Sequence, residues 1–241
     1  MTKKETVSVS TTAATRSSTN DVYELLRQKI LEHSIPPATK INILQLSKDL
    51  GVSATPIREA LRLLQGDNLL VATSNKGYAT TETLDLKGVR DLFELRLLIE
   101  PWAARIAASN RLQNPGVELK DEIANFNPKS GSIQHEMFGH DTRFHKAILG
   151  TTANETVIQA FEQAHCHLHL FRMYRDGWDW KTSIEQHKAI AQAISNGDPA
   201  AAEEAMRNHL NSAYSRFIAV MPKDGEVRPI SKVSPGKLIR K

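Results

Sequence analysis

Four side chains in the second half of the chain have the types and the spacing of a metal site. Asp141 and His145 are four residues apart, so on a helix both point from the same face. His187 and His209 lie in two later helical segments, and an antiparallel bundle can bring such positions to one point. Three imidazoles and a carboxylate suit Zn²⁺, Ni²⁺, Mn²⁺ or Fe²⁺, and ligand type alone does not choose among these ions. Most helical histidines are exposed or hydrogen-bonded, so a site without metal stays open as the alternative.

A second group of residues has the form of a DNA-recognition helix. Residues 44–61 predict two short helices joined at Gly51, where a turn with positive φ is easiest for glycine. Ser53 is a good N-cap for the second helix. With Ile57 and Leu61 committed to the core, the outer face carries small, polar and basic side chains: Ala54, Thr55, Arg58 and Arg62. Such a face is typical of a helix that enters the major groove.

A helix and a β-hairpin flank this motif, so residues 19–80 predict a winged helix. The strands of the hairpin are expected over 69–73 and 78–80, with a tight turn between them. Lys76 and Gly77 then lie at the tip of the wing, where a lysine can neutralise a phosphate and a glycine allows close approach of the backbone. A good hairpin turn explains these two residues equally well.

Helical patterns fill the chain from residue 85 to 221, after a linker at 81–84, and predict an antiparallel bundle of six helices. Their expected spans are 85–109, 117–126, 133–149, 154–175, 181–196 and 198–219. The expected fold class is therefore mainly α, with the small β-hairpin as the wing. Residues 1–18 predict a disordered arm, because they offer almost nothing to bury, and residues 222–241 predict a basic tail.

Composition indicates a cytoplasmic protein without membrane contact. The chain has 241 residues and a net charge of +4, and the excess positive charge lies in its two ends. Cys166 is the single cysteine, so a disulfide within the chain is excluded and a reducing compartment is expected. No apolar run approaches the roughly 18–20 residues that span a bilayer, and the first residues lack the apolar core of a signal peptide.

The segments VSATPIREALRLL (52–64) and NKGYAT (75–80) resemble the DNA-binding domain of the GntR family of bacterial transcription regulators. The resemblance implies DNA contacts at the start of the recognition helix, within it and at the wing tip. The expected contact residues are Ala54, Thr55, Pro56, Arg58, Arg62, Lys76 and Gly77. Many family members carry arginine at the position of Ala54, so a bidentate contact to guanine is missing here and the operator sequence is expected to differ.

The bundle segments resemble the FCD-type effector domain of the FadR-like branch of this family. The similarity is carried by FELRLLIEP (93–101), DTRFHKAIL (141–149), EQHKAIAQAISNGD (185–198) and AMRNHL (205–210). A count of six bundle helices looks more like the VanR-type subgroup. Metal-binding members use an aspartate, the histidine four residues later and one histidine from each of the last two helices. The resemblance therefore implies a divalent metal at Asp141, His145, His187 and His209.

The same resemblance implies a small organic acid as the effector, with a carboxylate at the open positions of the ion. Arg96 could clamp a second carboxylate oxygen or a hydroxyl in bidentate fashion. Alternatively, Arg96 pairs with Glu100, four residues on, at the helix surface. His167 and Arg172 are further candidates for the effector site, and plain packing or exposure is the alternative for His167.

These observations predict a ligand-responsive transcription regulator, expected to be a repressor, that binds double-stranded operator DNA as a homodimer. Two alternatives stay open. One is a metal-dependent hydrolase with an accessory DNA-binding domain, in which a metal-bound water attacks the substrate. It is disfavoured because the sequence has no clear general base, nucleophile elbow or phosphate loop at motif spacing, so we predict that the chain is not an enzyme. The other alternative is a regulator whose metal is purely structural.

Overall fold

The computed structural model describes residues 18–73, 77–129, 132–173 and 179–221. The chain divides into two compact units at the peptide bond between Thr81 and Glu82. The predicted basic tail, Lys76 and all of the predicted arm except Ser18 lie outside the described residues. Among the described helices, none combines the length and the apolar character needed to cross a membrane.

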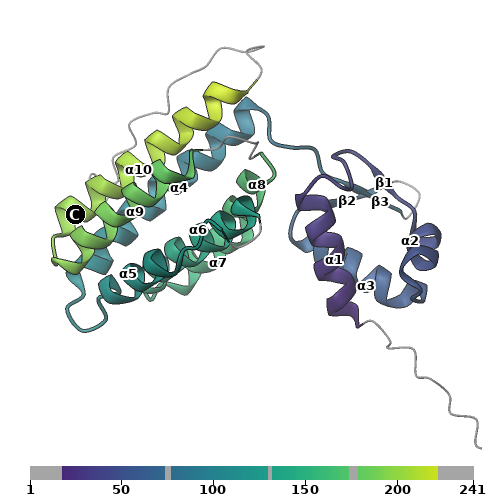
Figure 1. Ribbon diagram of the computed structural model, residues 1–241, viewed down its shortest axis with the longest axis horizontal. Coiled ribbons are helices and arrows are strands. Elements are labelled where there is room, and N and C mark those ends of the chain that lie inside the picture. The colour runs from purple at the N-terminus through teal and green to yellow at the C-terminus, as the bar shows by residue number, and fades with distance from the viewer. Residues whose placement is uncertain (1–17, 74–76, 130–131, 174–178, 222–241) are drawn as a thin grey trace, which may run out of the picture. The chain divides into compact units, whose positions relative to one another are not determined.

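The described residues of the N-terminal unit form three helices and three short strands, which are labelled in Figure 1. In chain order these are α1 (Thr19–Leu31), β1 (Lys40–Ile41), α2 (Ile43–Leu50), α3 (Ala54–Gly66), β2 (Leu70–Thr73) and β3 (Gly77–Thr80). Both α1 and α2 pack against α3. Buried apolar side chains of α1 and α3 supply much of the core: Val22, Leu26, Ile30, Ile57, Leu61 and Leu64. The pairing of α2 with α3 is the predicted helix-turn-helix.

Local residue chemistry sets the ends of these helices. Gly51 ends α2 with a φ of 65°, as the sequence predicted for this turn. Ser53 precedes α3 at the predicted N-cap position, but its side chain makes no capping hydrogen bond. The first helix begins with a capping box, in which Ser18 and Asp21 each bond the other's backbone N–H.

The three strands form one antiparallel sheet with β3 in the centre, between β1 and β2. Ala79 of β3 lies opposite Lys40 on one side and opposite Val71 on the other. The buried Thr80 accepts a hydrogen bond of 2.8 Å from the backbone N–H of Thr39. This bond holds β1, which begins at the next residue, against β3. The sequence did not predict β1, because a strand of two residues is too short to show alternation.

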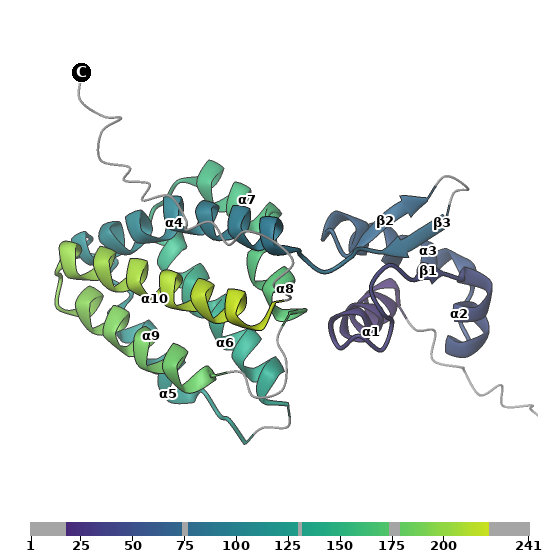
Figure 2. The ribbon, with the colours of Figure 1, turned by 90° about the horizontal axis from the view of Figure 1, so that it is seen from above.

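The C-terminal unit is all helical within its described residues. Its elements are α4 (Leu86–Ser109), α5 (Gly116–Asn125), α6 (Ile133–Gly150), α7 (Glu155–Gln163), α8 (Cys166–Phe171), α9 (Trp180–Ser195) and α10 (Pro199–Val220). The helices α4, α9 and α10 lie side by side, and α4 also contacts α6 and α8 (Figure 1, Figure 2). The mainly helical fold is confirmed, and α4 is the central helix onto which the site's other helices pack.

The prediction of six bundle helices is wrong by one. The single helix expected over 154–175 is broken into α7 and α8, so the described part of this unit has seven helices. His165 adopts a φ of 45° at the break, and a left-handed residue cannot continue a right-handed helix. Helical spacing of apolar side chains continues across the break, so no local pattern marked it. The helix count therefore does not support the VanR-type subgroup.

Candidate metal centre

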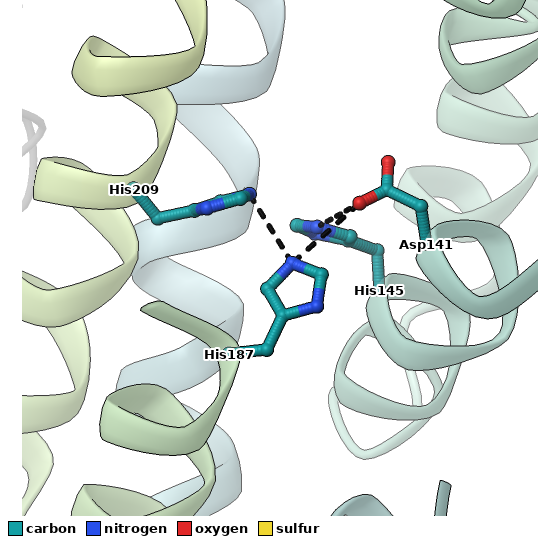
Figure 3. A group of neighbouring side chains, drawn as sticks. All are labelled: Asp141, His145, His187 and His209. Atoms are coloured by element: carbon teal, nitrogen blue, oxygen red, sulfur yellow. Dashed lines mark hydrogen bonds and ion pairs between the residues drawn. The ribbon is translucent and has the colours of Figure 1, made fainter. Parts of the chain in front are cut away.

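The four side chains singled out in the sequence meet inside the C-terminal unit (Figure 3). Asp141 and His145 come from α6, His187 from α9 and His209 from α10. All four are buried, and one ligand atom from each lies within 4.8 Å of the others. The antiparallel packing of α9 with α10, opposite α6, is what brings residues 68 positions apart in the sequence to one point.

Three of the distances between these atoms are close to those of donors around one ion. His187 Nε2 lies 3.5 Å from Asp141 Oδ1 and 3.4 Å from His209 Nε2. His145 Nε2 lies 3.7 Å from Asp141 Oδ1. Metal–ligand bonds of roughly 2.0–2.2 Å place neighbouring donors about 3.0–3.5 Å apart. The four donors therefore need only small shifts to share a divalent ion.

The surroundings of His145 Nε2 indicate whether the four residues of the cluster fit a metal ion. Both ring nitrogens of His145 are buried without a hydrogen bond to any described residue, and Nδ1 is in ion-pair contact with Glu100 whereas Nε2 has no such close partner. Buried polar atoms are nearly always satisfied, and an exception asks for an explanation such as an ion. A metal bound between His145 and Asp141 would supply the missing partner, so the donor set fits the group that the sequence implied.

The buried ion pair of Arg96 with Glu100 contacts the Nδ1 side of the His145 ring. The Nδ1 atom of His145 contacts Glu100 of α4, and Arg96 Nε donates to Glu100 Oε1 at 2.5 Å. Arg96, Glu100 and His145 are all buried. Burial by itself would raise the pKa of Glu100, but Arg96 and His145 outweigh it and hold that pKa far below its usual range. Glu100 is therefore an ionised carboxylate in contact with His145, one of the candidate metal ligands.

The other two histidines are oriented in the same way. His187 Nδ1 lies 2.9 Å from His140 Nε2, and His140 Nδ1 lies 3.1 Å from Glu122 Oε1. His209 Nδ1 lies 3.1 Å from Gln186 Oε1. Because each Nδ1 is engaged, each Nε2 is left to face the centre of the cluster. Hydrogen bonds of this kind fix the tautomer and the ring orientation of metal-binding histidines.

Electrostatics favours the metal-binding protonation state at three of the four residues: His187, His209 and Asp141. Burial lowers the pKa of His187 and of His209 well below the usual value, so both rings are neutral at neutral pH. Burial would raise the pKa of Asp141, but His145 and the hydrogen bond from His167 outweigh it and lower that pKa instead. Neutral imidazole and ionised carboxylate are the forms that bind metal ions.

The three candidates for the effector site have different surroundings. His167 Nδ1 donates to Asp141 Oδ2 at 2.8 Å, so this ring lies beside the cluster. Arg96 forms the ion pair with Glu100 that the sequence offered as an alternative, but the pair is buried, so its expected place on the helix surface is wrong. Arg172 is buried at the end of α8, where its Nη1 donates to the Glu82 carbonyl at 3.4 Å.

The candidate DNA-contacting residues lie on the outer face of α3. Thr55 and Arg58 are exposed, and Ala54 and Pro56 are half-buried in the first turn. Arg62 is exposed and pairs with another side chain of α3, Glu59, at 3.3 Å. This face is therefore free of core contacts while Ile57 and Leu61 anchor the opposite one.

The wing turn is described only in part. Gly77 begins β3, opposite Thr73 of β2. A Cβ at Gly77 would lie 2.9 Å from Thr73 Oγ1, so close approach within the hairpin is one reason for glycine here. Lys76 lies outside the described residues.

Sequence reasoning missed the residues that orient the ligands. Glu122, His140 and Gln186 were not singled out, and Glu100 was considered only as a surface partner of Arg96. His140 directly precedes Asp141, but adjacent helical residues point in different directions, so its position gave no reason to join it to the cluster. The clearest available signal was the placement of Glu100 four residues after Arg96 on the largely apolar α4.

Comparison with known proteins decides the family. Residues 91–212 match the FCD domain, and residues 18–79 match the bacterial regulatory proteins of the gntR family. The chain belongs to the GntR family and carries an FCD domain. This GntR-family protein is a transcription regulator that acts on operator DNA, not an enzyme, and the FCD domain is its effector-binding part.

The similar proteins agree with this assignment. The chain is 25% identical over 193 residues to the uncharacterized HTH-type transcriptional regulator YdhC of Bacillus subtilis (strain 168), covering 78% of this chain and 86% of YdhC. It is 27% identical over 189 residues to the Nta operon transcriptional regulator of Aminobacter aminovorans, covering 77% and 87%. A GntR regulator from Rhodococcus sp. RHA1 has the same fold, with a TM-score of 0.67, 18% identity and coverage of 85% and 99%.

Proposed function

We propose that this GntR-family regulator binds a divalent metal through Asp141, His145, His187 and His209, and that the metal anchors a small carboxylate effector. Zn²⁺, Ni²⁺, Mn²⁺ and Fe²⁺ all suit this donor set. The observation that supports the proposal most directly is the convergence of four buried ligand atoms within 4.8 Å. When bound, the ion would supply a Lewis-acidic centre for the carboxylate oxygens of the effector.

The residues around the cluster would select and orient the effector. Four protein atoms leave two positions of an octahedral ion for a carboxylate. We assign His167 to the wall of this site, because its ring contacts Asp141, and we keep Arg172 as a second candidate. Arg96 would act on the effector only indirectly, because its guanidinium is engaged by Glu100.

We propose that residues 19–80 read operator DNA and that residues 85–221 carry the metal and the effector. Thr55 and Arg58 would contact base edges, with Ala54, Pro56 and Arg62 beside them and Lys76 and Gly77 on the wing. In a homodimer, two recognition helices would read half-sites about one helical turn apart. Where the operator overlaps a promoter, the bound dimer would block transcription and act as a repressor. It would act in the cytoplasm, where operator DNA lies.

Effector binding would regulate the protein through its differential affinity for two states. A ligand shifts an equilibrium only as far as it binds one state better than the other. The metal-loaded protein should therefore change its operator affinity when the correct organic acid is added, and the protein stripped of metal should not.

Metal analysis of the purified protein tests the first step. The wild-type protein should retain about one divalent ion per chain after dialysis, and His209→Ala should retain almost none. His135→Ala is the matched control, because His135 lies on α6 outside the four-residue set. Full metal content in His209→Ala would contradict the assigned site.

Operator binding tests the second step. Fluorescence anisotropy with promoter DNA from the protein's own gene region should report a change in affinity with one class of small organic acid. If chelation lowers the melting temperature while no acid changes the operator affinity of the metal-loaded protein, the metal is structural and the sensing role is wrong.

A further inference from the structure

The core of the C-terminal unit contains a complete ion pair. The side chains of Arg96 and Glu100 on α4 are only 2% and 1% exposed. Arg96 Nε donates to Glu100 Oε1 at 2.5 Å, and Arg96 Nη2 donates to Glu100 Oε2 at 3.4 Å. Removing two charges from water often costs more than their attraction returns. An ion pair in this place therefore asks for a role beyond stability.

The second contact of Glu100 suggests that role. The Oε2 atom of Glu100 contacts His145 Nδ1. An ionised carboxylate can only accept hydrogen bonds, so Nδ1 must carry the proton and Nε2 must be the atom with the free lone pair. That Nε2 faces Asp141 Oδ1 at 3.7 Å, in the centre of the proposed metal site. Glu100 thus selects the tautomer of His145 that can bind an ion.

The partner of His145 also differs from those of the other two histidines. His187 is oriented by His140 and His209 by Gln186, both of which are uncharged partners when the His140 ring is neutral. A carboxylate partner raises the basicity of an imidazole ligand as well as orienting it. Among the three rings, His145 should therefore depend most strongly on its partner.

We infer that Glu100 is a positioning residue of the metal centre, and that Arg96 holds the Glu100 carboxylate against His145 instead of clamping the effector. The inference rests on the proposed metal site. It assigns the two buried charged residues of α4 a common task, and it explains why a full ion pair lies at the point where α4 meets α6.

Metal affinity of Glu100→Gln tests the inference. Removing a partner of this kind typically weakens metal binding about 10- to 100-fold, and we expect Glu100→Gln to fall in that range by calorimetric titration with Zn²⁺. The absorption spectrum of the Co²⁺-loaded protein should also change, because the field of the His145 ligand changes. A residue that only supports the fold would alter the melting temperature without altering that spectrum.

The chain offers a matched control on the same helix. Arg90 and Glu94 form another pair four residues apart on α4, with Arg90 Nε 3.4 Å from Glu94 Oε1. Both side chains are about one-third exposed, at 32% and 30%. Glu94→Gln should bind Zn²⁺ with wild-type affinity and give the wild-type Co²⁺ spectrum.

A double variant covers the case in which Glu100→Gln does not fold, since it leaves Arg96 buried without its carboxylate. Arg96→Met with Glu100→Leu removes both charges, and such replacements are often neutral or stabilising. This variant should fold and should bind Zn²⁺ at least about 10-fold more weakly than the wild type, because His145 Nδ1 has lost its acceptor.

The outcomes separate this inference from the proposed function. If the folded variants bind Zn²⁺ within about twofold of the wild type and keep its Co²⁺ spectrum, Glu100 has no positioning role while the metal site stands. If the wild type itself binds no divalent ion, the proposed function fails first.

Discussion

His140 Nε2 lies 2.9 Å from His187 Nδ1, so a histidine outside the predicted ligand set orients one inside it. The second nitrogen of His140 lies 3.1 Å from Glu122 Oε1. Glu122 in turn accepts two hydrogen bonds of 2.9 Å from the guanidinium of Arg143. A continuous series of polar contacts therefore runs from an exposed arginine to the centre of the cluster. Mutation of partners of this kind typically costs about 10- to 100-fold in metal affinity.

Substitution of His140 should weaken metal binding without removing a ligand. His140→Phe keeps a planar ring in the same space but cannot bond His187 Nδ1, so we expect the Zn²⁺ affinity to fall about 10-fold or more in calorimetric titrations. His135→Phe, at another position of α6, should bind normally. Equal affinities for the two variants would show that His187 needs no orienting partner.

Removal of the metal should destabilise the protein. A ligand present at about 100 times its Kd stabilises the folded state by about 2.7 kcal/mol. For a chain of this size that corresponds to a fall in Tm of about 5–10 °C on chelation, measured by differential scanning calorimetry. His209→Ala should have the same Tm with and without chelator. A chelator-dependent shift that persists in this variant would place the metal elsewhere.

Arg58 should dominate recognition by α3. Arg58→Ala should lower operator affinity about 10- to 100-fold in fluorescence anisotropy, because an exposed arginine on the recognition helix can reach a base edge or a phosphate. Arg62→Ala should have a smaller effect, because Arg62 is already paired with Glu59. Metal content should match the wild type in both. Operator affinity that survives the loss of Arg58 would contradict the contact assignment.

Gly116 should be essential for the packing of α5 on α9. A Cβ at this buried position would lie 2.7 Å from Ser195 Cα, a backbone atom that cannot move aside. Gly116→Ala should therefore lower the free energy of unfolding by about 1–3 kcal/mol in urea titrations. Gly150→Ala is the control, because nothing lies within 4 Å of a Cβ at that helix end. Similar stabilities for the two variants would mean that α5 shifts freely.

The sequence predicted much of the N-terminal unit because its signals are local. Gly51, Ser53 and the apolar spacing of α3 each report on a few neighbouring residues, and the structure agrees with the turn and the helices they predicted. The strand β1 depends on a contact with a distant segment, that of Thr39 with Thr80, and the break at His165 is a left-handed residue that is neither glycine nor proline. Neither could be seen in a local pattern.

For the metal centre, the order of the amino acids was enough to predict the residue types: one aspartate and one histidine on the same helical face, with two more histidines on later helices. The packing of the helices placed Glu100, His140 and Gln186 against the three rings, since each contact crosses from one helix to another. It also decided that Arg96 is buried beside Glu100 and not at the surface. This division arises because helical spacing fixes direction within one helix, whereas helix packing fixes which faces meet.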